Sequence, residues 1–156
     1  MTVNPNPEQT SADDVLTLAT SMKIMGAVVW MMQSSPLHRN YSVEMLLKRI
    51  GPSLQNNQFR YYEDPQRGPI AFCNWAFLSD SNLNQIVSTG RDPEAHEWAS
   101  GENIYFVEMI APFGHCRHVV RDLREAVFPK GQRGFAIRGQ VYRDKPNGIR
   151  LQKFRS

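Results

Sequence analysis

"PIAFCNWAFLS", residues 69–79, is apolar at almost every position. A short stretch of this kind favours a strand that is covered on both faces, as at the centre of a sheet. It follows "FRYYED" (59–64) and the turn "PQRG" (65–68), so the three segments together predict a β-hairpin. Farther along the chain, "IYFVEMIAP" (104–112) predicts another strand of the same kind, ended by Pro112. These strands are expected to form the centre of the sheet.

Two helices are predicted before this hairpin. A capping box at Ser11 precedes apolar residues with helical spacing, so one amphipathic helix is expected over residues 12–33. We expect its apolar stripe to face the core; the stripe comprises Val15, Leu18, Met22, Met25, Val29 and Met32. A second helix is expected over residues 43–50, ended by Gly51 and Pro52.

The rest of the chain alternates between polar and apolar segments. Residues 80–103 are polar and irregular, with short helices at most, and a helix is predicted over residues 116–128. Two strands, 134–144 and 149–155, joined by the turn "KPNG", are expected to close the chain as a hairpin. Helices therefore come first, and a mostly antiparallel sheet with a helix packed on it follows. This order is typical of the α+β class.

Length and composition limit the class of protein further. For 156 residues we expect a disordered tail over residues 1–10 and a single domain over residues 11–156. The polar start of the chain does not resemble a secretory signal, and the longest apolar run, Ile24–Met32, is far shorter than the roughly 20 residues that span a bilayer. Two cysteines, Cys73 and Cys116, fit a reducing compartment. We therefore predict a cytoplasmic protein.

Charge is distributed unevenly along the chain. Residues 1–114 hold 7 Lys/Arg and 12 Asp/Glu, a balance of −5, whereas residues 115–156 hold 11 Lys/Arg and 3 Asp/Glu, a balance of +8. The basic end is either a solvated face or a docking surface for an acidic partner. Charge alone leaves open whether that partner is a nucleic acid or an acidic protein.

One carboxylate lies inside an apolar strand. Glu108 is expected to share a face with the apolar residues Ile104, Phe106 and Ile110, because side chains alternate along a strand. A carboxylate shielded from water needs a cation or a hydrogen-bond donor. Glu108 is therefore either half of a structural ion pair, for example with Arg138, or a functional group.

The turn "SSPLHRN" (34–40) places His38 and Arg39 directly after the most apolar part of the chain. The two residues either face water in a capped loop, or the turn holds a base against an apolar wall. A second histidine motif, "HCRH" (115–118), lacks the further ligand pair that a zinc site needs, so we predict no metal site.

Three of these stretches occur together in one family. "SSPLHRN", "CNWAFLS" and "YFVEMIAPFG", in this order and at about this spacing, resemble the RTX-toxin-activating lysine acyltransferases, and the resemblance runs from about Trp30 to Phe154. It implies a GNAT-like fold without the usual coenzyme A pyrophosphate loop, in agreement with the single Gly114 after "IAPF". It also implies a cytoplasmic homodimer with no bound cofactor. Such an enzyme moves a fatty acyl chain from acyl carrier protein to internal lysines of an RTX protoxin.

The same resemblance assigns roles to single residues. His38 falls at the position of the family's catalytic histidine, and Glu108 at the position of its catalytic aspartate. Ser35 and Arg39 would assist as auxiliary residues, and Arg49 stands where the family has an asparagine. The two departures imply an altered geometry around the histidine, or a different acceptor or acyl chain.

Acyl transfer to lysine explains why a histidine is needed. A free lysine, with a pKa of about 10.4, is almost wholly protonated at pH 7, so a base near neutrality must act on it. His38 would be this base, oriented by Glu108, or would itself carry the acyl group. The basic side chains of Arg117, Arg121 and Arg124 would dock the strongly acidic acyl carrier protein, and no nucleic acid is expected as a partner.

Two other functions remain open from the sequence. One is a GNAT-like N-acyltransferase that acts on another amine or uses coenzyme A, which a comparison of acyl donors would distinguish. The other is a protein without catalytic activity that binds the protoxin or a nucleic acid through its basic end. The glutamate at position 108, in place of the family's aspartate, motivates this second alternative.

Overall fold

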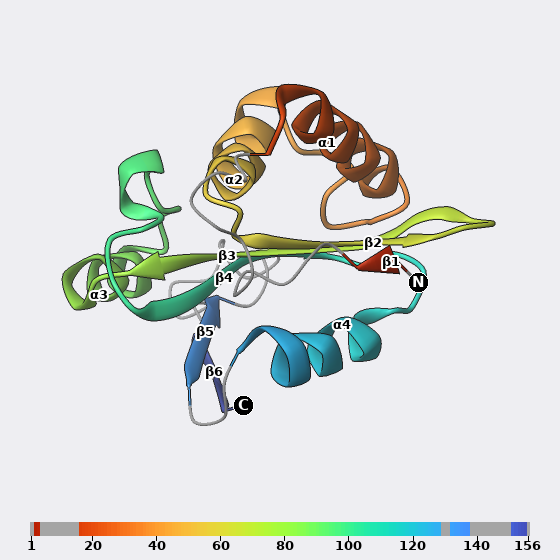
Figure 1. The fold of residues 1–156 in the computed structure, drawn as a ribbon. Coiled ribbons are helices and arrows are strands. Elements are labelled where there is room, and N and C mark those ends of the chain that lie inside the picture. Colours follow the sequence, from red (N-terminus) through yellow and green to blue (C-terminus); the bar gives the residue numbers. More distant parts are fainter. Residues whose placement is uncertain (1, 4–15, 129–131, 138–150, 156) are drawn as a thin grey trace.

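The structure is a computed structural model that describes residues 2–3, 16–128, 132–137 and 151–155. Its helices are α1 (Leu18–Met32), α2 (Val43–Gln55), α3 (Asp80–Thr89), a 3₁₀ helix (Ala95–Glu97) and α4 (Cys116–Asp122), which a π-helical turn (Leu123–Val127) continues. Its strands are β1 (Thr2–Val3), β2 (Phe59–Asp64), β3 (Gly68–Leu78), β4 (Asn103–Ile110), β5 (Arg133–Ile137) and β6 (Leu151–Arg155). Helices α1 and α2 cover one face of the sheet and α4 the other, while α3 lies at one end (Figure 1).

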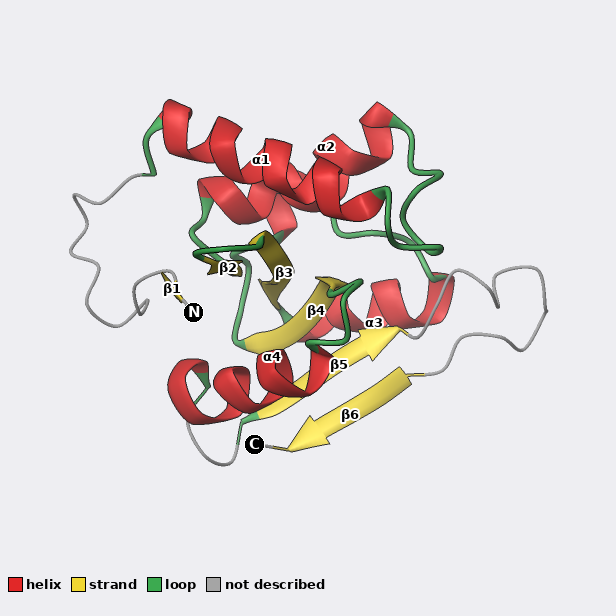
Figure 2. Ribbon diagram, turned by 90° about the vertical axis from the view of Figure 1, so that its right-hand side faces the viewer, coloured by secondary structure: helices red, strands yellow, loops and turns green. Residues whose placement is uncertain are grey.

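The predicted α+β class is confirmed. The described strands lie in the order β1 to β6, and each neighbouring pair is antiparallel except β4 and β5, which are parallel. Strands β5 and β6 extend the sheet beyond β4 (Figure 2). The expected tail contributes Thr2 and Val3 to β1, which pairs with β2; residues 4–10 lie outside the described residues, as do Arg138 and the turn 145–148.

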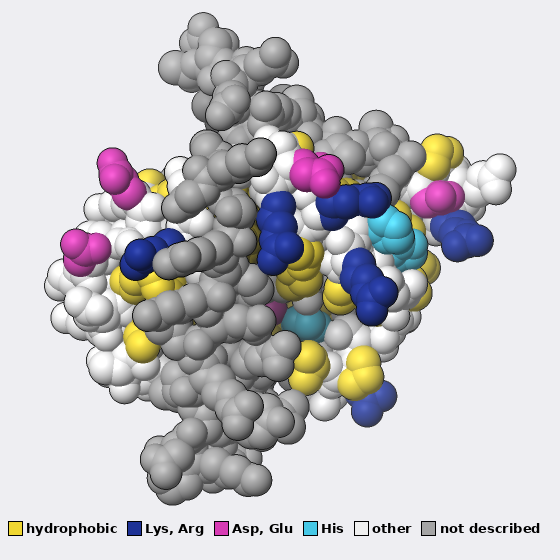
Figure 3. Space-filling view, turned by 90° about the horizontal axis from the view of Figure 1, so that it is seen from below, with side chains coloured by type: hydrophobic (Ala, Val, Ile, Leu, Met, Phe, Trp, Pro, Cys, Tyr) yellow, Lys and Arg dark blue, Asp and Glu magenta, His cyan; other side chains and the backbone are white. Residues whose placement is uncertain are grey.

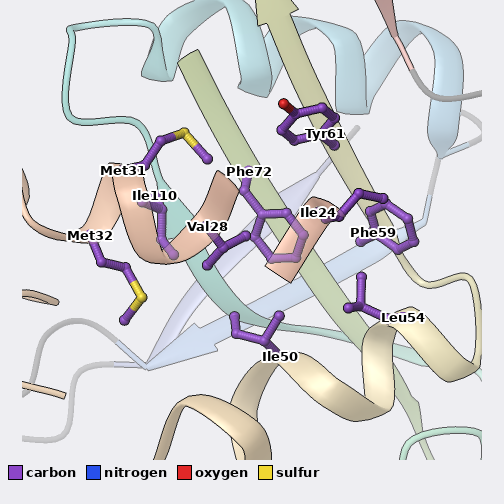
Figure 4. Close-up of a cluster of buried hydrophobic side chains, with 10 residues drawn as sticks. All are labelled: Ile24, Val28, Met31, Met32, Ile50, Leu54, Phe59, Tyr61, Phe72 and Ile110. Carbon is purple, nitrogen blue, oxygen red and sulfur yellow. The ribbon is translucent and has the colours of Figure 1, made fainter. Parts of the chain in front are cut away.

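Strand β3 is buried on both faces, as predicted from residues 69–79. Phe72, Cys73 and Ala76 are fully buried. Phe72 belongs to the apolar cluster beneath α1 and α2, which Figure 4 shows, and Cys73 belongs to the cluster beneath α4. The predicted hairpin of β2 and β3 also forms.

Helix α1 differs from the prediction in its start and in its buried face. It begins at Leu18 rather than at residue 12, because Thr17 caps it by accepting the backbone N–H of Thr20 at 3.2 Å; Ser11 lies outside the described residues. The buried side chains are Ile24, Val28, Met31 and Met32, whereas Leu18, Met22, Val29 and Trp30 are exposed. Of the predicted stripe, Met32 is buried and Met25 packs against the same cluster, Leu18, Met22 and Val29 are exposed, and Val15 lies outside the described residues. Because the helix is apolar on more than one side, spacing alone predicted only part of the buried face.

Helix α2 is longer than predicted, since it passes through Pro52 and ends at Gln55. A proline inside a helix costs about 3 kcal/mol. Here Ile50 and Leu54, on either side of Pro52, are both buried in the cluster against the sheet, and this packing outweighs the cost. Both the backbone N–H and the side-chain amide of Asn56 donate to the Pro52 carbonyl and close the helix.

A β-bulge in β4 reverses the expected alternation of faces. Asn74 pairs with Glu108 but Trp75 pairs with Phe106, so Val107 is an extra residue in β4. Phe106 therefore packs in the cluster beneath α4, while Glu108 faces α1 and α2. The prediction that Glu108 shares a face with Ile104 and Phe106 was wrong; of the three apolar neighbours, only Ile110 lies on its face.

The segments beyond β3 largely follow the sequence pattern. Residues 80–103 contain α3 and the 3₁₀ helix, and the predicted helix over residues 116–128 forms as α4 and its π-helical turn. Val119 and Leu123 bury its apolar face, and the Tyr62 hydroxyl of β2 donates to Asp122 at 2.7 Å. No helix among the described residues combines the length and apolar character needed to cross a membrane.

Candidate active site

The turn between α1 and α2 holds Ser35 and His38 in fixed positions. Backbone N–H groups of Ser35, His38 and Tyr41 each donate to the carbonyl three residues earlier, at 3.0 Å. Ser42 then caps α2 by accepting the Met45 N–H at 3.1 Å. The turn directs His38 inward, where its side chain is 7% exposed, and leaves Arg39 exposed. The two residues therefore have different surroundings, and only His38 lies against the apolar helix layer.

Ser35, His38 and Glu108 form one continuous chain of hydrogen bonds. The Ser35 Oγ lies 2.6 Å from His38 Nδ1, and His38 Nε2 lies 3.0 Å from Glu108 Oε2. All three residues are buried. The structure thus brings together the three residues to which the resemblance to the acyltransferases assigns roles, although His38 and Glu108 are 70 residues apart in the sequence.

The second oxygen of Glu108 has its own donors. The Tyr41 hydroxyl donates to Oε1 at 2.8 Å, and Arg49 Nε donates to the same oxygen. Arg49 also donates through Nη1 to Asp92 and through Nη2 to the Val107 carbonyl, the latter at 2.8 Å. The buried cation beside Glu108 is therefore Arg49 of α2; Arg138, the partner considered from the sequence, lies outside the described residues.

These contacts set the charge states in the site. Burial opposes ionisation of Glu108, but hydrogen bonding to His38 and the charge of Arg49 outweigh burial and hold the pKa of this carboxyl below its ordinary value. Burial, reinforced by the charge of Glu108, raises the pKa of Tyr41, so the phenol remains a donor. Although burial opposes the charge of Arg49, Glu108 and Asp92 raise its pKa, and the guanidinium stays charged.

The ionised Glu108 determines which nitrogen of His38 carries the proton. A carboxylate can only accept, so Nε2 of His38 must donate to it. In the neutral imidazole, Nδ1 then has the free electron pair and accepts the Ser35 hydroxyl. The basic atom of this site is therefore Nδ1, and it faces Ser35.

Asn74 of β3 hydrogen-bonds to the backbone of two residues of the site. Its Oδ1 accepts the backbone N–H of Glu108 at 2.9 Å, and its Nδ2 donates to the Arg49 carbonyl at 2.8 Å and to Ser53 Oγ at 3.0 Å. One buried amide therefore fixes the backbone of both Glu108 and Arg49.

The predicted basic side chains lie apart from this chain of hydrogen bonds. Arg117, Arg121 and Arg124 are all exposed on α4 and its continuation, on the opposite face of the sheet from α1 and α2. Basic and histidine side chains gather over this helix, beside a hollow in the surface (Figure 3). In the described part of the chain, no three His, Cys, Asp or Glu side chains are grouped closely enough to hold a metal ion, the motif at 115–118 included.

Sequence reasoning missed three contributors to the site and named a fourth, Arg49, only as a departure from the family and not as the partner of Glu108. Two of these four carried a signal: Arg49 is a charged residue on the buried face of α2, and Asn74 is a polar residue in a strand that is apolar on both faces. Tyr41 and Asp92 carried none, since they reach the site from a turn and from the segment after α3, 67 residues from Glu108 and 43 from Arg49.

Several known proteins are similar in sequence to this chain. A model of the RTX toxin acyltransferase family matches residues 17–155. The chain is similar to the lysine-acyltransferase RtxC of Vibrio cholerae serotype O1, at 49% identity over 81% of this chain and 84% of the relative. It is also similar to the RTX-II toxin-activating lysine-acyltransferase ApxIIC of Actinobacillus pleuropneumoniae, at 30% identity over 70% of this chain and 68% of the relative. The protein-lysine myristoyltransferase HlyC of Escherichia coli is 37% identical over 60% of this chain and 54% of its own length.

Proposed function

Because this chain belongs to the RTX toxin acyltransferase family, we propose that it is a protein-lysine acyltransferase that activates an RTX protoxin. It moves a fatty acyl chain from the thioester of acyl carrier protein to internal lysine side chains. The observation that carries the proposal is the buried chain Ser35–His38–Glu108, which supplies a base where acyl transfer to an amine requires one. The names of the similar proteins support the reaction class and the protoxin as acceptor.

The reaction forms a C–N bond and breaks a C–S bond. The neutral lysine amine attacks the thioester carbonyl, and the surplus proton on its nitrogen passes to Nδ1 of His38. Ser35, whose hydroxyl already bonds to Nδ1, relays this proton. The imidazolium, stabilised by Glu108, then gives the proton to the leaving thiolate, so the products are an amide and a thiol.

The hydrogen bonds favour a base over an acyl-carrying histidine. Nε2 of His38 donates to Glu108 and Nδ1 accepts from Ser35, so neither nitrogen offers a free electron pair to the thioester carbonyl. For His38 to carry the acyl group, one of these two bonds must first break. General-base catalysis needs no such rearrangement, since the proton moves along a bond that is already made.

Acyl carrier protein is proposed to dock on α4. Arg117, Arg121 and Arg124 are exposed there, and the acid between them in sequence, Asp122, is turned toward Tyr62 of the sheet. The sequence of residues 115–156 has the same sign of charge, with 11 Lys/Arg against 3 Asp/Glu. An acidic protein fits this surface, and no nucleic acid is proposed.

The proposed setting is a homodimer in the cytoplasm with no bound cofactor. Two cysteines, buried Cys73 and exposed Cys116, are both free thiols, as a reducing compartment favours. The exposed apolar stripe of α1, formed by Leu18, Met22 and Val29, is a surface that a second copy would cover. The likeness to the GNAT fold stays a prediction.

The experiment compares donors with purified protein and an RTX protoxin as acceptor. We expect acyl-lysine, detected by mass spectrometry, with acyl-acyl carrier protein and not with acyl-coenzyme A. His38→Ala should lower the rate about 10²- to 10⁴-fold. The matched control is His96→Ala, which removes an exposed histidine and should keep the rate. Equal turnover with both donors contradicts the donor assignment, and full activity of a folded His38→Ala protein contradicts the mechanism.

A further inference from the structure

Arg49 contacts the carboxylate that orients His38, and it does so from a buried position. Its guanidinium uses all three nitrogens: Nε donates to Glu108, Nη1 to Asp92 and Nη2 to the Val107 carbonyl. Only 11% of its side chain is exposed, so it offers little surface to a substrate. Its chemistry is therefore directed at Glu108 and the backbone of β4.

We propose that Arg49 is a positioning residue, which turns Glu108 so that one carboxylate oxygen is held against His38, and that Asp92 holds Arg49 in this orientation. The inference rests on the proposed acyl transfer, and it assigns to Arg49 a role in orienting the base rather than in selecting an acceptor or acyl chain.

The two carboxylate oxygens of Glu108 have different partners. Arg49 and the Tyr41 hydroxyl both bond to Oε1, and His38 bonds to Oε2. A glutamate has three rotatable side-chain bonds, and its last torsion has a broad energy profile. Two donors on Oε1 remove this freedom and leave Oε2 pointing at Nε2 of His38.

The planar shape of the Arg49 guanidinium suits this arrangement. Its planar fork reaches two carboxylates and a carbonyl from three separate nitrogens, whereas a lysine carries its three donors on a single nitrogen. Asp92 pairs with Nη1 of Arg49 while Glu108 pairs with Nε, so the guanidinium is held between two carboxylates. Glu108 and Arg49 are thus held at the side chains by each other and at the backbone by Asn74.

A purely structural role would show in stability alone, so the test needs other readouts. Acyl transfer is measured as kcat and KM from about pH 5 to 9 for the wild type, Arg49→Met, Arg49→Lys and Asp92→Asn, with thermal unfolding of each. Arg60 is also a buried arginine, and its Nε lies 3.4 Å from Asp122 Oδ2. It provides the matched control Arg60→Met.

We expect Arg49→Met to lower kcat about 10- to 100-fold, by analogy with the loss of partners that orient metal-bound histidines, with KM for the carrier protein little changed. Without Arg49 the pKa of Glu108 rises, so the carboxylate takes up a proton at higher pH and the acid limb of the profile moves to higher pH. Arg49→Lys and Asp92→Asn should fall between this variant and the wild type. Arg60→Met should lose stability but keep kcat and the profile.

A double variant separates the loss of positioning from the loss of stability, and the wild type and His38→Ala serve as references. Arg49→Met/Glu108→Gln should recover stability relative to Arg49→Met, since the carboxylate of Glu108 is no longer buried without its cation, but should not recover kcat. If Arg49→Met does not fold, Arg49→Lys and Asp92→Asn carry the same test. Folded variants with full kcat and an unshifted profile overturn the positioning role, provided that the wild type is active and His38→Ala is not. An inactive wild type would instead overturn the proposed function.

Discussion

At the scale of single residues, the length of the side chain at position 108 matches the distance it must cover. Glu108 starts from a bulged strand and reaches partners on the turn before α2 and on α2 itself. An aspartate at this position would have a carboxylate about 1.5 Å farther from these partners, the length of one C–C bond. A contact at 3.0 Å to His38 does not survive such a withdrawal without movement of the backbone.

The first prediction therefore concerns Glu108→Asp. We expect a loss in kcat of at least about 10-fold, because His38 loses its orienting partner, and a lower melting temperature, because Arg49 loses part of its pairing. Steady-state kinetics and thermal unfolding measure the two effects. The matched control is Glu44→Asp, the same change at an exposed position in the first turn of α2. An aspartate variant as fast as the wild type would mean that the carboxylate position is not fixed as described.

At the scale of elements, the segment after α3 is held by its own ion pair. Arg91 donates to both oxygens of Glu97 at 2.7 Å, and Glu97 accepts the backbone N–H of Glu94 at 2.8 Å. These hydrogen bonds, from Arg91 first, lower the pKa of Glu97 to about 2. The segment that contains Asp92, the partner of Arg49, is thus held in place by hydrogen bonds between its own residues.

Stability should depend on pH through this pair. A carboxyl whose pKa is lowered by folding stabilises the protein above its unfolded pKa, near 4.5, and this contribution is lost as pH falls toward 2. Glu97→Gln should therefore destabilise the protein at pH 7 by at most about 3 kcal/mol, less where solvent screens Arg91. Denaturant unfolding from about pH 7 to 2 should show the gap to wild type shrinking below pH 4.5. Arg91→Met should behave alike; a gap independent of pH would contradict this origin.

The basic helix α4 yields a prediction about encounter with the donor. Arg121→Glu/Arg124→Glu should raise KM for acyl-acyl carrier protein and flatten its salt dependence, because exposed charges act mainly on association. The value of kcat should change little, since these side chains are not among the contacts of His38 or Glu108. Arg67→Glu, an exposed position in the turn between β2 and β3, is the control. An unchanged KM in the double variant would place donor docking elsewhere.

At the scale of the whole molecule, the layer of helices above the sheet leaves apolar side chains uncovered. Leu18 is 77% exposed, Met22 66% and Val29 48%, and all three lie on one side of α1. Met22→Glu should therefore shift the proposed homodimer to monomer in analytical ultracentrifugation, since it places a charge in an apolar interface. Thr20→Glu, on another side of the same helix, should leave the assembly unchanged. A wild-type protein that sediments as a monomer would contradict the dimer.

Much of this architecture was predictable from local pattern, and its exceptions have long-range causes. Residues 69–79 predicted β3 because apolar side chains on both faces imply burial on both. The passage of α2 through Pro52 was not predictable, since it depends on how Ile50 and Leu54 pack against the sheet. The bulge at Val107 depends on pairing with a strand about 30 residues earlier, so no local pattern marks it. In the candidate site, Ser35, His38 and Glu108 were predictable, whereas Tyr41 and Asp92 enter only through the tertiary fold.

The buried pair of Arg49 and Glu108 also restricts how this protein can change in the course of evolution. Loss of Glu108 alone leaves a buried arginine with one acid missing, and loss of Arg49 alone leaves a buried carboxylate short of a cation, so either first step is unfavourable. Two positions 59 residues apart are therefore inherited as one unit. Lineages that exchange one of them should exchange the other soon after, so that the residues found at these two positions vary together among descendants.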